Sequence, residues 1–118
     1  RIIYIYHTII DMLEIENNDV SFMDNKDCYN LLYFTAKWCG PCKRISPLLD
    51  KLSEGLDSDI VTIYKVDIDE NDELADKLKI KSVPTFFLYH KKKYIDQRGG
   101  ADINKVKELL TTNIKDDQ

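Results

Sequence analysis

Apolar and polar positions along this chain alternate between two spacings, one typical of strands and the other typical of helices. Residues 31–36 (LLYFTA) form an apolar run without a polar face, as in a strand buried on both sides of a parallel sheet. After Cys42 the apolar residues recur at intervals of three and four, which predicts an amphipathic helix ending near Gly55. Its apolar positions are Ile45, Leu48, Leu49, Leu52 and Leu56.

The same two patterns continue towards the end of the chain. They predict strands over residues 60–69, 83–90 and 94–100, helices over residues 73–80 and 103–114, and a turn at Lys91–Lys93. From residue 31 the order of elements is therefore β-α-β-α-β-β-α. This order predicts an α/β fold with a mixed central β-sheet flanked by helices on both faces.

The first thirty residues fit two kinds of element. Apolar residues from Ile2 to Leu13 form a helical stripe, and we predict a helix through about residue 14, although an edge strand fits the first few residues as well. The chain contains no internal repeat, low-complexity tract or linker, so we expect a single domain over residues 1–118. Within it we expect an N-terminal extension and variable segment over about 1–29 and a core over 30–115.

Composition and charge restrict the kinds of partner that we expect for the protein. The 118 residues are 43% hydrophobic and 32% charged, as in ordinary globular domains, and the net charge of −4 makes nucleic acid an unexpected partner. No apolar run approaches the ~20 residues needed to span a bilayer, so we expect no membrane insertion. Because the chain begins at Arg1, we expect a processed product. We predict a secretory or vacuolar protein without its signal peptide, with a cytoplasmic location as the alternative.

Two of the three cysteines lie two residues apart in WCGPCK, residues 38–43. A metal clip, a structural disulfide and a redox switch all use such a pair. Zinc takes four ligands, and neither His7 nor His90 lies at a spacing typical of a finger, so we expect no metal. A disulfide between Cys39 and Cys42 would close a very short loop and constrain the unfolded chain little. A reversible redox switch is the remaining interpretation.

The predicted helix start explains why the first cysteine would be the reactive one. Cys39 would present its sulfur to unpaired backbone N–H groups and to the positive end of the helix dipole, and both favour the thiolate. Cys42 lies one turn further along the helix. It is placed to attack the mixed disulfide that Cys39 forms with a substrate, so we predict Cys39 as nucleophile and Cys42 as resolving residue.

Three segments together resemble the thioredoxin family over roughly residues 30–115. They are LLYFTAKWCGPCK (31–43), KSVPTFFLY (81–89) and RGGAD (98–102). The resemblance implies a thioredoxin fold, a cis peptide bond at Val83–Pro84 beside the dithiol, and pairing of the substrate peptide with the backbone next to Pro84. The substrate-binding surface that it implies consists of Trp38, Gly40, Pro41, Val83, Pro84, Gly99 and Ala101.

The resemblance also implies the reaction and the partners. Substrates would be disulfide-containing proteins, and no cofactor would reside in the chain, because electrons arrive from a thioredoxin reductase that uses NADPH or from small thiols such as glutathione. Trp before CGPC resembles the reducing members, so we expect a protein-disulfide reductase. Two alternatives remain open: a disulfide oxidase or isomerase, and a redox-active subunit of a protein-export or protein-unfolding complex, which the apolar N-terminal extension motivates.

One position departs from the family pattern. Thioredoxins usually carry a buried aspartate six residues before the nucleophile, where this chain has Tyr33, while Lys65 matches the lysine that pairs with that aspartate. We hypothesise that Cys42 resolves mixed disulfides more slowly here and that Lys65 relays protons or tunes the pKa values of the cysteines. The alternative is that Tyr33 only fills space and water relays the proton. Cys28 has no partner in the sequence, and we expect a buried, inert thiol.

Overall fold

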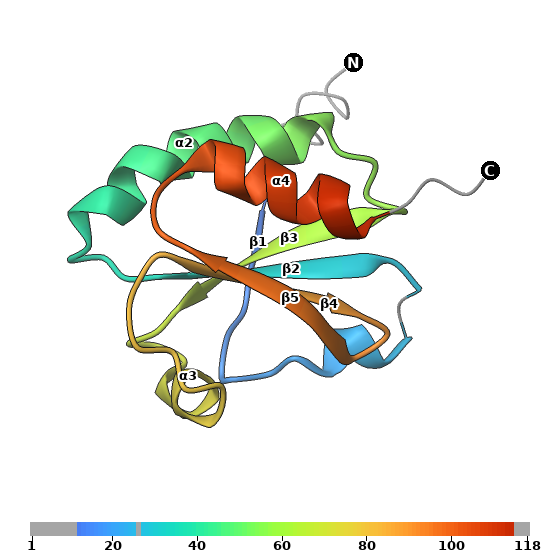
Figure 1. Cartoon of the computed structure of the whole chain (residues 1–118). Helices are drawn as coiled ribbons and strands as arrows, with labels where there is room; N and C mark the ends of the chain where they lie inside the picture. The colour runs from blue at the N-terminus through green and yellow to red at the C-terminus, as the bar shows by residue number, and fades with distance from the viewer. Residues whose placement is uncertain (1–11, 26, 115–118) are drawn as a thin grey trace, which may run out of the picture.

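The computed structural model describes residues 12–25 and 27–114 and contains a five-stranded sheet with helices on both faces (Figure 1). Within the described ranges, no helix is long and apolar enough to cross a membrane. The elements in chain order are β1 (Leu13–Glu14), the 3-10 helix η1 (Ser21–Asn25), β2 (Tyr29–Thr35), α2 (Gly40–Gly55), β3 (Val61–Asp67), α3 (Asp72–Lys77), β4 (Thr85–His90), β5 (Lys93–Gly99) and α4 (Ile103–Asn113).

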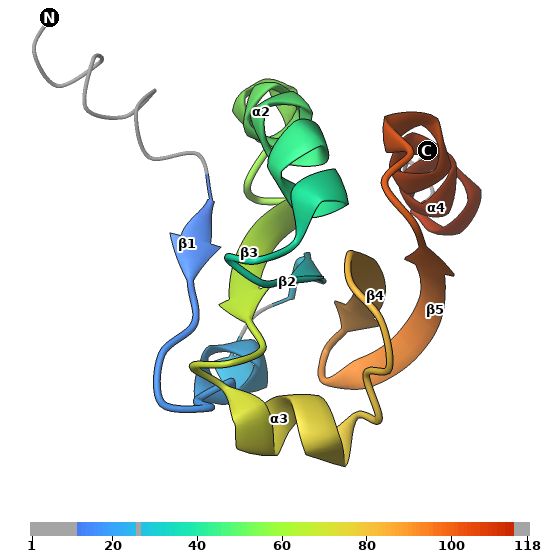
Figure 2. The ribbon, with the colours of Figure 1, turned by 90° about the vertical axis from the view of Figure 1, so that its left-hand side faces the viewer.

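The sheet is mixed, with the strand order β1-β3-β2-β4-β5. Strands β1, β2 and β3 run parallel, whereas β4 is antiparallel to β2 and β5 is antiparallel to β4. Helices α2 and α4 cover one face of the sheet and α3 lies on the other (Figure 2). The predicted order of elements from residue 31 and the predicted α/β architecture are confirmed.

Strand β2 separates the two halves of the hydrophobic core. Because successive side chains of a strand point to opposite faces, Leu31 and Tyr33 pack towards α2 and α4, while Leu32 and Phe34 pack on the opposite face. All four side chains are completely buried. This two-sided burial explains why the run LLYF has no polar position, and the prediction of a strand buried on both sides is confirmed.

The predicted apolar stripe of α2 is only partly a core stripe. Ile45 and Leu49 are buried against the sheet, whereas Leu48 is 46% exposed on the surface of the helix. Ile45 and Leu49 are four residues apart and lie on one side, and Leu48 is rotated away from the line between them. Spacing therefore identified the helix correctly but assigned one surface leucine to its buried face.

The predicted turn at Lys91–Lys93 joins β4 to β5. Lys91 and Lys92 have φ angles of 54° and 70°, and Lys93 already begins β5. Two successive residues with positive φ are typical of the tight hairpin turns that match the twist of antiparallel strands. The hairpin-turn interpretation of this basic cluster is confirmed.

The chain before β2 forms an edge strand where we predicted the end of a helix. Leu13 and Glu14 pair in parallel with Tyr64 and Lys65 of β3, so the prediction of a helix through residue 14 is wrong at its end. Its greater part, residues 1–11, lies outside the described residues. The physical reason is the open edge of β3, whose backbone groups need partners that β1 supplies.

A buried asparagine ties this early segment to the rest of the fold. The side chain of Asn71 donates to the carbonyl oxygen of Ile15 at 3.0 Å and accepts from the N–H of Asn18 at 2.8 Å. Asn18 in turn accepts at 2.9 Å from the N–H of Leu74 in the first turn of α3. The segment preceding β2 therefore supplies part of the N-terminal cap of α3.

Replacing Asn71 with Ala should lower the free energy of unfolding by about 2–3 kcal/mol, because it leaves the buried carbonyl oxygen of Ile15 and the partly buried N–H of Asn18 without this partner. Urea unfolding followed by circular dichroism measures this change. The matched control is Asn104→Ala, an exposed asparagine of α4, which should change stability by less than about 0.5 kcal/mol. Equal effects of the two variants would contradict a structural role of the Asn71 network.

Candidate functional site

The cysteine pair lies at the junction between β2 and α2. Cys39 is the N-cap of α2, and its sulfur accepts a hydrogen bond from the backbone N–H of Cys42 at 3.1 Å. The two residues are joined by a disulfide, with Cα atoms 5.3 Å apart. The first backbone N–H groups of a helix have no partner within the helix, and Pro41 has no N–H at all. The N–H of Cys42 is one of these groups, and the sulfur of Cys39 accepts it. The predicted pairing of Cys39 with Cys42 is confirmed.

The start of α2 favours negative charge on the sulfur of Cys39. The first turn of this helix contains no acidic residue, and Lys43 and Arg44 follow it. The partial positive charge of the helix N-terminus and the direct N–H contact both stabilise a thiolate relative to a thiol. Reduction of the disulfide would therefore leave Cys39 as the activated nucleophile of the pair.

Two further segments of the chain meet the dithiol. The sulfur of Cys39 lies 3.7 Å from the carbonyl oxygen of Val83, and the bond from Val83 to Pro84 is cis, as the resemblance to the thioredoxin family implies. The N–H of Gly100 donates to the carbonyl oxygen of Pro84 at 3.0 Å. Gly100 has a φ of 97°, which strains any residue with a side chain, so the second glycine of RGGAD is needed at this contact.

The predicted surface residues lie around this junction with different exposures. Trp38 is 67% exposed, and its indole N–H donates to the carboxylate of Asp69 at 2.9 Å. Val83 is half-buried and Pro84 is buried. The remaining predicted surface residues, all exposed, are Gly40, Pro41, Gly99 and Ala101.

Asp69 is a site residue that sequence reasoning missed. It follows the carboxyl end of β3, and β2 leads into the dithiol from the same edge of the sheet. Parallel strands bring their carboxyl ends to one edge of the sheet. A polar residue at the end of the predicted strand at 60–69 could therefore have been identified from the sequence as a candidate site residue. By accepting the indole N–H of Trp38, Asp69 orients an exposed aromatic side chain next to the cysteines.

Tyr33 contacts the second cysteine directly. Its side chain is completely buried, its ring stacks on Phe86 with centroids 5.2 Å apart, and its hydroxyl donates to the carbonyl oxygen of Cys42 at 3.2 Å. Burial raises the pKa of the Tyr33 phenol above its ordinary value. Tyr33 therefore does more than fill space, because its hydroxyl joins the central strand to the first turn of α2.

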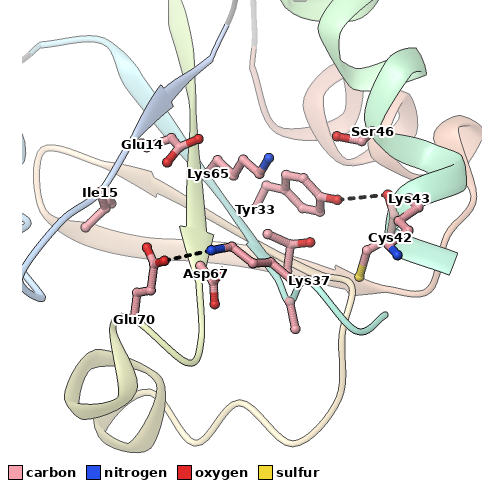
Figure 3. Close-up of a pocket in the computed structure, with 12 residues that line it drawn as sticks. Glu14, Ile15, Tyr33, Lys37, Cys42, Lys43, Ser46, Lys65, Asp67 and Glu70 are labelled. Atoms are coloured by element: carbon pink, nitrogen blue, oxygen red, sulfur yellow. Dashed lines mark hydrogen bonds and ion pairs between the residues drawn. The ribbon is translucent and has the colours of Figure 1, made fainter. Parts of the chain in front are cut away.

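A cavity of about 560 Å³ lies behind the dithiol, between the sheet and the start of α2 (Figure 3). Tyr33 and Cys42 line it on one side, and Lys65 and Asp67 of β3 line it on another. Beyond these it is lined by Glu14, Ile15, Thr35, Ala36, Lys37, Lys43, Ser46 and Glu70. The predicted residue Lys65 therefore lines the same mixed-charge cavity as Cys42.

The remaining cysteine and histidine lie apart from the dithiol. Cys28 is a buried free thiol whose sulfur lies 3.9 Å from the side-chain oxygen of Asn30. The ring of His90 stacks on Tyr29, and one of its nitrogens lies 2.9 Å from the carbonyl oxygen of Asp27. His7 is outside the described residues. In the described part of the chain, no three metal-binding side chains come together.

Comparison with known proteins agrees with this geometry. The model of the thioredoxin family matches residues 12–115. Thioredoxin of Geodia cydonium is 38% identical over 80% of this chain and 89% of its own, and thioredoxin of Malassezia sympodialis is 41% identical over 66% and 74%. The crystal structure of Schistosoma mansoni thioredoxin superposes with a TM-score of 0.80 at 33% identity, over 88% of this chain and 96% of that one.

The fold and the dithiol at the start of α2 define a protein-disulfide oxidoreductase. This chain belongs to the thioredoxin family.

Replacing Tyr33 with Phe removes one hydroxyl and should destabilise the protein by about 1 kcal/mol at pH 7, through the lost hydrogen bond to Cys42. A phenol whose pKa is raised in the folded state stabilises the fold fully below the unfolded pKa, near 10, and this contribution is lost as the pH rises further. The difference in unfolding free energy between the wild type and Tyr33→Phe should therefore become smaller as the pH rises above about 10.

Urea unfolding at a series of pH values measures this gap. The exposed Tyr94 provides the control, and Tyr94→Phe should change stability at pH 7 by less than about 0.5 kcal/mol. A gap for Tyr33→Phe that widens above about pH 10 would refute the assigned direction of the pKa shift.

Proposed function

We propose that the protein reduces disulfides in other proteins through the Cys39–Cys42 pair. The observation that carries this proposal is the sulfur of Cys39, which caps the N-terminus of α2 and lies 3.7 Å from the carbonyl oxygen of Val83. One and the same sulfur is thereby activated as a thiolate and placed beside a backbone segment that a substrate can reach. Membership of the thioredoxin family supports the same reaction.

The reaction proceeds in two exchanges of sulfur partners. The Cys39 thiolate attacks a substrate disulfide, so that a mixed disulfide forms and one substrate sulfur leaves with the electron pair of the broken bond. Cys42 then loses its proton and attacks the sulfur of Cys39, forming the Cys39–Cys42 disulfide and releasing the second substrate sulfur. Two electrons pass from the protein to the substrate, and the released substrate thiolates take their protons from the surrounding water or from groups of the site.

The surface around the dithiol suits an extended, apolar peptide. Trp38 is exposed beside the cysteines, and the predicted surface residues Gly40, Pro41, Gly99 and Ala101 carry no charge. The backbone at Val83 and Pro84 borders the reactive sulfur and would pair with the substrate backbone. Few side chains are specific enough to select one sequence, so we propose a broad range of protein substrates.

Electrons for the next turnover come from outside the chain. We propose that a thioredoxin reductase or a small thiol such as glutathione reduces the Cys39–Cys42 disulfide again, without a resident cofactor. For the compartment, we propose the secretory pathway or a vacuole, with the cytoplasm as the alternative. In this scheme Lys65 assists proton movement through the cavity that it shares with Cys42.

Variants of the two cysteines test the roles assigned to them. Cys42→Ser should form a mixed disulfide with a substrate such as oxidised insulin and stay trapped in it, because no second sulfur is available to release the product. Cys39→Ser should form no such adduct, because it lacks the activated sulfur. Mass spectrometry under non-reducing conditions measures the adduct. Trapping through Cys42 in the Cys39 variant would reverse the assigned roles.

The reduction potential of the pair tests the direction of the reaction. Equilibration with glutathione and dithiothreitol should give a value of about −270 mV, which is typical of thioredoxin and is expected here from family membership rather than from the geometry of the site. A value above about −200 mV would instead favour a disulfide oxidase or isomerase.

A second role is favoured by the extra chain before the core. We propose that the protein is similar to the secreted second thioredoxin of malaria parasites, because its abundance of Ile, Lys, Asn, Asp and Tyr is typical of an AT-rich genome. Its role would then be that of a redox-active subunit in a protein-export complex, with disulfide reduction as its chemistry. The apolar stretch before Leu13 would provide the contact with that complex.

Deletion of residues 1–11 tests this second role. The deletion leaves β1 and the dithiol in place, so disulfide reduction should remain unchanged while co-purification with a larger assembly from the native cell is lost. Analytical ultracentrifugation of the native extract measures the size of the assembly. A full-length protein that sediments only as a free monomer would contradict the role as a subunit.

A further inference from the structure

The second cysteine has to lose a proton inside the protein. Cys42 is only 2% exposed, and its thiol must become a thiolate before it attacks the mixed disulfide on Cys39. The N–H that stabilises negative charge at the helix start points at the sulfur of Cys39, at 3.1 Å, and not at that of Cys42. A group on the inner side of the site is therefore needed to receive the proton of Cys42.

Tyr33 and Lys65 lie where the family pattern has its aspartate and lysine, and neither side chain is suited to accept this proton. Tyr33 uses its hydroxyl hydrogen in the bond to the carbonyl oxygen of Cys42, and the raised pKa of its phenol keeps that hydrogen in place. The side chain of Lys65 contains hydrogen-bond donors and no acceptor oxygen. Among the side chains that line the cavity, the carboxylates are the remaining proton acceptors.

The register of the sheet distinguishes these carboxylates. Glu14, Lys65 and Tyr33 form one row across β1, β3 and β2, because each lies opposite the next in its strand pair. Asp67 lies one row further along β3, opposite Thr35, on the same face of the sheet. Since α2 begins just after the carboxyl end of β2, the row of Asp67 is the one nearer the dithiol.

Burial leads to the same choice. Asp67 is half-buried and lines the cavity together with Cys42, whereas Glu14 and Glu70 are exposed. Glu70 is moreover paired with Lys37 at 3.1 Å at the surface (Figure 3). One oxygen of Asp67 accepts the N–H of Asp69 at 2.9 Å, which holds the carboxylate in place and leaves its other oxygen for the cavity.

We propose that the carboxylate of Asp67, acting across this cavity, accepts the proton that Cys42 loses when it resolves a mixed disulfide. The cavity is large enough for water to carry the proton between the two residues. The electron pair of the Cys42 thiolate forms the bond to Cys39, and the electron pair of the broken bond leaves on the substrate sulfur. Asp67 passes the proton on to water, and a proton reaches Cys42 by the reverse path when the disulfide is next reduced. This inference rests on the proposed function.

The charges around Asp67 make the test decisive. The ionisable groups that face it from the neighbouring elements are Glu14, Tyr33, Lys37, Lys43, Lys65 and Glu70. Removing one negative charge from this set favours a thiolate at Cys42, so a purely electrostatic influence of Asp67 predicts faster resolution in Asp67→Asn. Loss of a proton acceptor predicts slower resolution in the same variant.

Asp67→Asn is the appropriate change, because an asparagine side-chain oxygen can still accept the N–H of Asp69 and keep the turn. The reduced protein, in excess, is mixed rapidly with 5,5′-dithiobis(2-nitrobenzoate), and release of the coloured thiolate is followed with time. The first release reports attack by Cys39 and the second reports attack by Cys42. The coloured thiolate leaves without a proton, so the second rate depends on the deprotonation of Cys42 alone.

In Asp67→Asn the second release should slow about tenfold at pH 7, and the gap should close towards about pH 9, where hydroxide takes the proton instead. The first release should stay unchanged. Glu70→Gln, which changes an exposed carboxylate at the same cavity, should leave both releases unchanged. Adding Tyr33→Asp to Asp67→Asn should restore the second rate, because it places a carboxylate on the neighbouring strand facing the same cavity.

Three results would overturn the proposal. They are a second release that is unchanged or faster in Asp67→Asn at pH 7, a slowing of equal size at every pH, and a slowing that Glu70→Gln reproduces. Failure of the proposed function is distinguishable from all three, because it appears in the reduction potential of the wild-type pair and in the cysteine trapping variants, and not in the rate of the second release.

Discussion

The burial of β2 on both faces is the constraint on which the rest of the structure depends. Its side chains from Leu31 to Phe34 have no contact with solvent and separate the two halves of the core. A strand enclosed in this way cannot shift its register without moving apolar groups into water. The dithiol follows only a few residues later, so its position is held by the core.

The same constraint determines what kind of chemistry the site can support. Helix α2 begins at the edge of the sheet, so its N-terminal N–H group reaches the sulfur of Cys39 while the rest of the helix packs on the core through Ile45 and Leu49. Cys42 faces inward as a consequence of the helical turn between the two cysteines. The sulfur of Cys39 therefore lies against backbone groups, whereas Cys42 lies against the side chains behind it, and both residues are buried.

Tyr33 places a large phenol at the buried position where the family pattern has a carboxylate. A large phenol in place of a carboxylate stacks on Phe86 and connects β2 to α2 through the carbonyl oxygen of Cys42. These contacts stabilise the junction between β2 and α2, but the phenol does not provide a proton acceptor for Cys42. The carboxylates that remain near Cys42 lie on other strands, and the cavity between the sheet and α2 connects them with the sulfur.

Local pattern was sufficient for most of the fold and for the reactive pair. The apolar runs and spacings predicted the elements from residue 31 onwards, and WCGPCK predicted the dithiol, because a strand, a helix start and a disulfide between near neighbours depend on adjacent residues. Contacts between segments that are distant in the sequence could not be predicted from local pattern. The bond from Trp38 to Asp69, the pairing of Glu14 with Lys65, and the cavity shared by Cys42 and Asp67 exist only once strands far apart in sequence lie side by side. The sequence thus determined which sulfurs react, and the tertiary structure decided which groups surround them, because side-chain environments depend on strand order and register.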